Sequence, residues 1–182
     1  GLMLLTFANI RAWRGHFAYE DHEAPWSVDA PNIEIGISNR PNYNGTARFH
    51  GGLIRIQDYA PMGAAFDAHF VIDGSRLALD RIDIETDGAR TSGSGIVDLA
   101  HWPEQTYQVR SRVQFPRMRE IFFAKEAWVL AGAGDFTGTF HLFKGGHDLA
   151  GNFTSPMAGL YDYRFPKLYG SLHWTRKAFE VA

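Results

Sequence analysis

The sequence predicts an all-β protein: an elongated, strongly curved, open and antiparallel-rich sheet of half-barrel shape, made of repeated strand-turn-strand units with at most one short helix. Three observations predict this fold. Apolar and polar residues alternate along several runs, which is the period at which side chains leave opposite faces of a strand. Asp-Gly and Gly-Gly steps separate these runs, where tight hairpin turns require positive φ. Glycines also recur inside the runs, where they favour bending of the sheet.

Composition limits the possible functions. The chain has 182 residues, which suits one domain, and 14 Phe, 7 Tyr and 5 Trp supply ample apolar surface. A compact fold of this size buries roughly two thirds of its unfolded surface. The formal net charge is −2 with no Lys/Arg block, so no nucleic-acid partner is expected. The absence of Cys excludes disulfides, thiolate catalysis and Cys-based zinc sites.

The whole chain, residues 1–182, is expected to form a single β-repeat segment, because no Pro-rich, Ser-rich or charged linker divides it. The short apolar run that starts at Leu2 falls well below the roughly 20 residues of a membrane span. It also lacks the basic start and the small-residue cleavage site of a signal peptide. We therefore interpret the chain as an internal fragment of a longer protein, with any targeting segment upstream.

The central strands are predicted from alternation. Residues 66–72 alternate apolar side chains with Asp67 and His69. The runs 77–79 and 82–84 alternate one register apart, so the Asp80-Arg81 step is predicted to be a bulge or a tight bend, because a one-residue slip moves every side chain to the other face. Three further runs alternate in the same way: Tyr107–Phe115, Phe136–Leu142 and Leu168–Trp174.

Turns and prolines agree with these strands. Turns are predicted at Asp73-Gly74, Asp87-Gly88 and Gly145-Gly146. Prolines are expected at run ends, where no ladder hydrogen bond is lost: Pro103, Pro116, Pro156 and Pro166.

One segment has helical character. Pro suits a first helical turn, and PRMREIFFA (Pro116–Ala124) places Met118, Ile121 and Phe122 on one face. The alternative for this segment is a connecting loop.

A unit of two strands joined by a Gly-containing turn is predicted three times. This repetition indicates an array whose units bury each other's apolar faces. It covers Ile10–Asp21, Val71–Ile82 and Phe140–Phe153.

Two glycine-rich stretches, GSG at Gly93–Gly95 and GAGDFTG at Gly132–Gly138, could suggest phosphate loops. A phosphate loop needs a Gly-rich turn that leads into a helix N-terminus. Here the following residues, IVDL and FTGTFHLF, alternate as strands, and no Lys-Ser/Thr follows. We interpret both stretches as structural glycines, and expect no cofactor.

Side chains that could carry catalysis or bind a metal are scattered. His141, His147 and Asp148 could share a metal across a hairpin, although the simpler interpretation is exposed strand histidines, and no compact ligand spacing occurs. The carboxylates of Asp80, Asp83, Glu85 and Asp87 could hydrolyse a glycan, but a solvated strand face explains them. No catalytic residue is therefore assigned, no metal is expected, and the chain is interpreted as non-enzymatic.

The apolar faces allow two outcomes. In a closed β-sandwich they form a dry core, which sheet physics alone favours, and the protein is then a carbohydrate- or protein-binding module that uses Trp102, Tyr107, Tyr161 and Tyr163. In an open sheet they line an apolar trough whose natural occupant is an acyl chain, at about 0.8 kcal/mol for each buried CH₂. The predicted groove residues are Phe66, Phe70, Ile72, Leu77, Leu79, Ile82, Ile84, Val109, Val113, Phe136, Phe140, Leu142, Leu172 and Trp174.

Three stretches carry a family resemblance that extends from about Ile10 onward. IRAWRGHFAYED followed by PNIEIGI, then FDAHFVIDGSRLALDRIDIETDGARTSGSGIVDL, then the strand units from Gly134 to Trp174 resemble the AsmA/TamB family of bacterial envelope proteins, in particular its TamB-like repeats. The resemblance implies a long periplasmic run of strands, anchored in the inner membrane at the N-terminus of the full-length protein. The resemblance also implies that those strands form a groove that passes phospholipid between the inner and outer membranes.

The same resemblance implies a role in outer-membrane biogenesis, as part of a translocation and assembly module with an Omp85-type outer-membrane barrel. The expected partners are therefore phospholipid and, in the full-length context, such a barrel. The expected location is the periplasm. This chain lacks the anchor of the family, so it is expected to be a middle segment.

Overall fold

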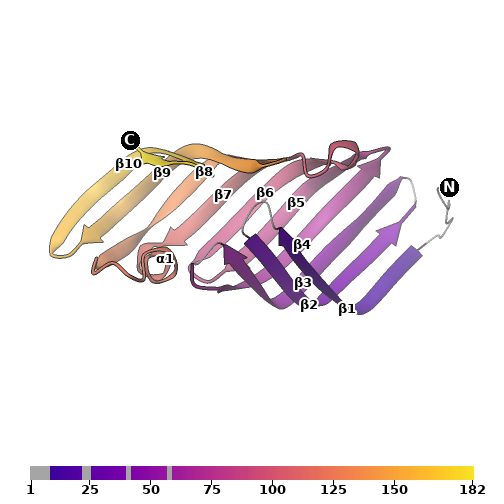
Figure 1. The fold of residues 1–182 in the computed structure, drawn as a ribbon, viewed down its shortest axis with the longest axis horizontal. Coiled ribbons are helices and arrows are strands. Elements are labelled where there is room, and N and C mark those ends of the chain that lie inside the picture. Colours follow the sequence, from indigo (N-terminus) through magenta and orange to yellow (C-terminus); the bar gives the residue numbers. More distant parts are fainter. Residues whose placement is uncertain (1–8, 22–25, 40–41, 57–58) are drawn as a thin grey trace.

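The computed structural model describes residues 9–21, 26–39, 42–56 and 59–182. They form one 11-stranded sheet in which every strand pairs antiparallel with its neighbours in sequence, from β1 to β11 (Figure 1). The strands are β1 (Asn9–Asp21), β2 (Trp26–Ser38), β3 (Tyr43–Ile56), β4 (Met62–Asp73), β5 (Arg76–Thr86), β6 (Ala89–Asp98), β7 (Gln105–Gln114), β8 (Leu130–Phe143), β9 (Gly146–Leu160), β10 (Tyr163–Thr175) and β11 (Phe179–Val181).

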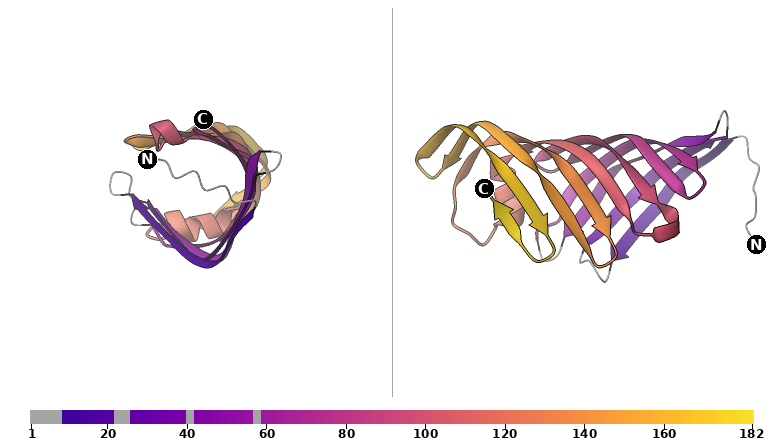
Figure 2. Two further views of the ribbon diagram at one scale, coloured as in Figure 1. Left: turned by 90° about the vertical axis from the view of Figure 1, so that its right-hand side faces the viewer. Right: turned by 90° about the horizontal axis from the view of Figure 1, so that it is seen from above.

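The sheet is open and strongly curved, as the sequence predicted. Viewed along its long axis it forms a curved wall that does not close (Figure 2). Across the described residues no ladder joins β1 to β11. Within the described ranges, two short helices interrupt the strands: the 3-10 helix η1 (Leu99–His101) and α1 (Phe115–Phe122). Helix α1 confirms the helical prediction, beginning one residue earlier and ending two residues earlier than expected.

Neighbouring rows of the ladder are apolar and polar in turn. One row of directly opposed residues is Ala47, Ala68, Ile82, Gly93, Val109, Gly138, Gly151, Leu172 and Val181. The adjacent row, on the other face, is Arg48, Asp67, Asp83, Ser92, Arg110, Thr137, Asn152 and Ser171. Because successive side chains of a strand leave opposite faces, the sheet has one apolar face and one polar face.

The apolar face is the concave one. Helix α1 lies inside the curve of the sheet (Figure 2). The Phe115 ring of α1 sits where a Cβ on Gly134 of β8 would point, with its Cζ 2.8 Å from that position. Gly134 is opposite Val113, which lies four residues along β7 from Val109 of the apolar row and therefore faces the same side. The helix therefore packs on the apolar side, and the polar side is convex.

The predicted bulge and turns are confirmed. The β4–β5 and β5–β6 ladders both shift register around Asp80 and Arg81, so Leu79 and Ile82 lie on the same face. Positive φ occurs at Gly74 (60°), Gly88 (79°) and Gly145 (86°), between successive strands. Asp-Gly and Gly-Gly steps thus turn the chain where the alternation breaks.

Two sequence predictions are wrong. Ile10–Asp21 is not a hairpin: it lies within the single strand β1, where Gly15 sits at a register shift against Ile33 of β2. The predicted strand-turn-strand unit is confirmed at Val71–Ile82 and Phe140–Phe153, where a turn separates two strands.

Pro156 and Pro166 do not end strands, since they lie inside β9 and β10. Pro156 is next to the register shift between β8 and β9, and Pro166 lies on the part of β10 with no β11 partner. A proline at a bulge or on an edge strand removes no ladder hydrogen bond.

Candidate functional site: an apolar trough

The concave face forms a continuous apolar surface, which we call the trough. It is defined by the ladder rows that pass through Phe66, Ala68, Phe70 and Ile72 of β4. The register places every predicted groove residue on this face: Phe66, Phe70 and Ile72 of β4; Leu77, Leu79, Ile82 and Ile84 of β5; Val109 and Val113 of β7; Phe136, Phe140 and Leu142 of β8; and Leu172 and Trp174 of β10. Their contact with a lipid remains a prediction.

Aromatic rings cover glycines on neighbouring positions of the trough. The Tyr107 ring lies over Gly95, so that a Cβ on Gly95 would be 2.1 Å from its Cδ1. The Phe136 ring lies over both Gly138 and Gly151, where its Cζ would be 2.6 and 2.7 Å from the added Cβ atoms. Alternation of large and small side chains is how the crowded interior of a curved sheet is filled. The trough therefore has a smooth aromatic floor.

Curvature buries part of this surface without a second sheet. Phe70, Ile82, Val97 and Leu142 are each 7% exposed or less. Leu79, Ile84, Phe136 and Phe140, on the same face, remain partly exposed. The trough is thus packed along its floor, and part of its apolar surface remains exposed.

Polar atoms of the trough are mostly satisfied within the protein. Thr91 and Ser111 share a hydrogen bond of 2.7 Å across β6 and β7. The Tyr107 hydroxyl donates to Gln105 Oε1 at 2.5 Å, and burial raises the pKa of Tyr107 to about 12. The exception is His147, whose Nε2 is buried without a hydrogen-bond partner.

Helix α1 covers one margin of the trough. Ile121 is 2% exposed, and its carbonyl accepts from the backbone N–H of Ala60, which precedes β4. The Phe122 ring meets Tyr59 edge-on, with 5.1 Å between ring centroids. The helix thus connects the β7–β8 side of the sheet to the β3–β4 connection and narrows the trough there.

A carboxylate fastens α1 to the sheet. Asp87, in the β5–β6 turn, accepts from the Gly63 backbone N–H at 2.9 Å and from Arg117 of α1 at 3.3 Å. These bonds, that from Gly63 first, lower the pKa of Asp87 despite partial desolvation. Arg117 also pairs with Glu120 in the same helix.

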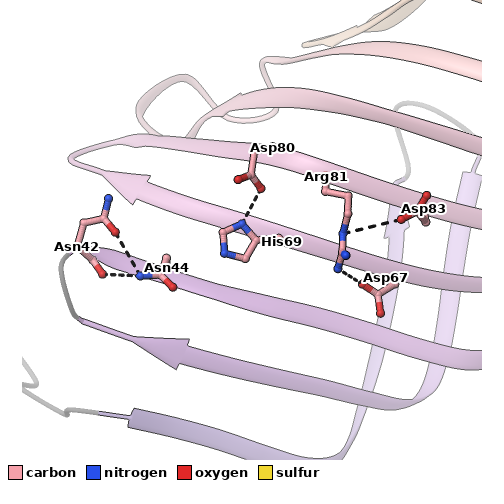
Figure 3. A network of polar contacts seen from close by, with 7 residues as sticks. All are labelled: Asn42, Asn44, Asp67, His69, Asp80, Arg81 and Asp83. Atoms are coloured by element: carbon pink, nitrogen blue, oxygen red, sulfur yellow. Dashed lines mark hydrogen bonds and ion pairs between the residues drawn. The ribbon is translucent and has the colours of Figure 1, made fainter.

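The convex face is polar and ion-paired. Asp67 accepts from Arg81 at 2.8 Å, and Asp80 contacts His69 at 2.6 Å (Figure 3). Asp83 lies 3.9 Å from Arg81, and Glu85 pairs with Arg90 at 3.1 Å. Such exposed pairs contribute about 0–1 kcal/mol each. The carboxylates Asp80, Asp83 and Glu85 therefore fit a solvated strand face, and Asp87 fits a helix tether.

The alternative metal set is wrong. His141 pairs in the ladder with Asp148 on the convex face, whereas His147 pairs with Leu142 on the concave face. The sheet therefore separates the two imidazoles. Across the described ranges, no group of three or more His, Cys, Asp or Glu side chains could hold a metal ion. His16 and His22 have the same six-residue spacing in the sequence as His141 and His147, but they fall outside the described side chains.

The closed-sandwich alternative is also wrong, because there is one open sheet. Its proposed sugar-binding aromatics do not gather: Tyr107 lies in the trough, Trp102 follows η1, and Tyr161 and Tyr163 lie at the β9–β10 turn. Gly93–Gly95 and Gly132–Gly138 lie within β6 and β8, as the strand interpretation predicted.

Several trough residues escaped sequence reasoning. Val97, His147, Leu149 and Phe153 share the concave face with the predicted set. Residues 147–153 alternate directly after the Gly145 turn, and this run was a usable signal. Small residues such as Ala68, which is fully buried, give no such signal, because Ala is found on either face of a strand.

No family model, curated protein or solved structure matches this chain. Within the described part of the chain, no helix is both long enough and apolar enough to cross a membrane.

Proposed function

We propose that this chain is a segment of a lipid conduit, in which the trough carries the acyl chains of phospholipids. The observation that carries the proposal is a single open sheet whose concave face is apolar across β4–β10 and partly exposed. Apolar surface on this scale, on one side of a polar sheet, is typical of a ligand groove. No catalytic role for a side chain is part of the proposal.

Transport along the trough follows from the uniformity of its surface. Each buried CH₂ contributes about 0.8 kcal/mol wherever it lies on an apolar wall. In the pairs Thr91–Ser111 and Tyr107–Gln105 the two side chains are already hydrogen-bonded to each other, so an acyl chain that passes them leaves neither side chain without a partner. A tail can therefore shift along the sheet while its head group stays in water.

The resemblance to the AsmA/TamB family supplies the cellular setting of the proposal. In that setting the trough belongs to a periplasmic protein, anchored in the inner membrane, that moves phospholipid between the inner and outer membranes. An Omp85-type barrel is the proposed partner of the full-length protein in outer-membrane biogenesis.

Native mass spectrometry of the purified chain, with lipid extraction from the same sample, tests the proposal. We expect co-purifying phospholipid in the wild type and its loss in Phe140→Asp and Ile84→Asp, because each change places a carboxylate in the apolar wall. Thr139→Asp is the matched control: Thr139 is the neighbour of Phe140 on β8 and faces the convex side.

Circular dichroism separates loss of binding from loss of fold. Phe140 is partly exposed, so Phe140→Asp should keep the strand signal of the wild type. A folded, lipid-free wild type that also fails to take up added phospholipid contradicts the proposal. Unfolding of Phe140→Asp but not of Thr139→Asp also counts against it, since Phe140 then belongs to an essential core.

A further inference from the structure

His147 is chemically isolated on the concave face. Across β4–β9 and residues 168–175 of β10, this face carries no Asp, Glu, Lys or Arg side chain. His147 is the single histidine on the same part of the face. Four other histidines each have a carboxylate partner: His69, His101, His141 and His173. His147 is therefore the group through which this part of the trough can acquire a positive charge.

The surroundings of His147 are aromatic. Its ring meets Trp174 of β10 edge-on at 4.7 Å and lies tilted against Phe140 of β8 at 6.3 Å. Phe140 in turn stacks on Tyr107 of β7, with 6.3 Å between centroids. A band of four rings thus crosses β7–β10, and its unsatisfied hydrogen-bonding atom is His147 Nε2.

Other ionisable groups near His147 face the convex side or lie at the ends of the strands. Asp148 follows it on β9 but faces the convex side, where it contacts His173 at 3.0 Å. On β8, His141 also faces the convex side and pairs with Glu104. At the ends of the strands, Lys144 is exposed in the β8–β9 turn, and Arg176 donates to the Gly145 carbonyl. Burial lowers the pKa of His147, and Asp148 opposes this only in part.

We propose that His147 binds the anionic head group, a carboxylate or a phosphate, of an amphiphile whose acyl chain lies in the trough. This inference rests on the proposed function. A buried imidazole without a partner gains a charge-assisted hydrogen bond when it takes up a proton beside an anion. The indole of Trp174 lies against the ring and moves aside when the head group contacts Nε2.

Proton uptake distinguishes this site from plain apolar binding. A neutral imidazole becomes an imidazolium when an anion arrives, so binding draws a proton from solvent at a pH between the pKa of free His147 and its higher pKa beside the anion. A neutral head group draws none. Phospholipids whose head groups remain in water bind through their tails and leave His147 unchanged.

Calorimetry with palmitate, hexadecyl phosphate and methyl palmitate tests the inference. We expect the wild type to bind palmitate and hexadecyl phosphate about tenfold more tightly than methyl palmitate, with a heat that varies with the ionisation enthalpy of the buffer. His147→Phe keeps a ring against Trp174 and should remove both the preference and the proton uptake. His173→Phe, on the convex face, should change neither.

The outcomes separate the two proposals. If the wild type binds methyl palmitate and palmitate equally, with no buffer-dependent heat, the proposal that the trough binds acyl chains is supported and the proposed role of His147 is wrong. If His147→Phe keeps the tenfold preference, the role of His147 is also wrong. If the wild type binds none of the three probes, the lipid trough itself fails. Imidazole NMR on the wild type gives a second readout: palmitate, and not its methyl ester, should raise the pKa of His147.

Discussion

The Tyr107 ring of β7 occupies the place of a side chain on Gly95 of β6, directly opposite in the ladder. The ring is partly buried there, and this burial raises the pKa of Tyr107. The same relationship recurs between Phe70 and Gly45, whose added Cβ would lie 2.8 Å from the ring Cζ. An aromatic residue and a glycine on adjacent strands are thus one packing unit of the trough.

Gly95→Ala should destabilise the protein. At a position without steric conflict this change stabilises by about 0.4–1 kcal/mol, because it restricts the unfolded chain. Here the new methyl group would be 2.1 Å from Tyr107 Cδ1, and overpacking of this kind costs about 1–3 kcal/mol. Urea unfolding should show a net loss for Gly95→Ala and almost none for Ser94→Ala, whose side chain is exposed on the convex face. Equal stability of wild type and Gly95→Ala would mean that Tyr107 moves freely.

Most of the fold was accessible from the sequence because the interactions that define it are local. Alternation gave the faces of β4, β5, β7 and β8, and the phase change at Asp80-Arg81 gave the bulge. The Ile10–Asp21 prediction failed because Gly15 has the same local signature whether it turns a hairpin or sits at a bulge opposite Ile33. Pairing with β2, which lies further along the chain, decides between the two.

The parts of the site that could not be predicted depend on contacts between distant residues. The sequence predicted the helix at 116–124 but not its docking, which uses Asp87 and Ala60. It also could not separate a trough from a sandwich, since the same alternation serves both. The sequence alone did not show that His147 is isolated, because this depends on the register, which places His141 on the opposite face.

Ile121→Ala should loosen α1 from the sheet. Ile121 is 2% exposed, and truncation of a buried Ile costs about 2–5 kcal/mol. An eight-residue helix has little stability of its own, so we expect amide exchange in residues 115–122 to accelerate more than exchange in β4–β7. Glu120→Gln, at an exposed position of the same helix, is the control. Uniform acceleration across the sheet would show instead that α1 unfolds only with the whole domain.

Asp87 should make stability depend on pH in the acidic range. Its folded pKa lies below the unfolded value of 3.8, chiefly because the Gly63 N–H donates to the carboxylate. The stabilisation is therefore fully present above the unfolded pKa and is lost as the pH falls through the folded pKa. Asp87→Asn should be less stable than wild type at pH 7, and the difference should shrink toward pH 3. If the difference in stability between Asp87→Asn and the wild type stays constant over this range, the Asp87 side chain acts through its shape and not through its charge.

His173 should act with the opposite dependence on pH. Its pKa is raised, first by the hydrogen bond to Asp148, so its contribution is fully present below the unfolded value of about 6.5 and disappears as the pH rises through the folded pKa. The contact is exposed and salt will weaken it. We expect His173→Gln to lower stability at pH 5.5 and to match the wild type at pH 9. A loss that is equal at both values would contradict the role of the imidazolium.

His147 should make the protein sensitive to acid from inside the trough. Burial lowers its folded pKa, so between that pKa and about 6.5 the unfolded state binds more protons than the folded state, and stability falls as the pH falls. Below the folded pKa the loss reaches its limit. His147→Phe removes the titrating group and keeps an aromatic ring beside Trp174, so this variant should lose less stability than the wild type between pH 8 and pH 5. Urea unfolding at fixed salt, with His173→Gln measured in parallel, separates the two histidines because their contributions have opposite signs. If His147→Phe is as sensitive to acid as the wild type, then the imidazole takes up its proton without leaving the band of rings, and the aromatic wall tolerates the charge.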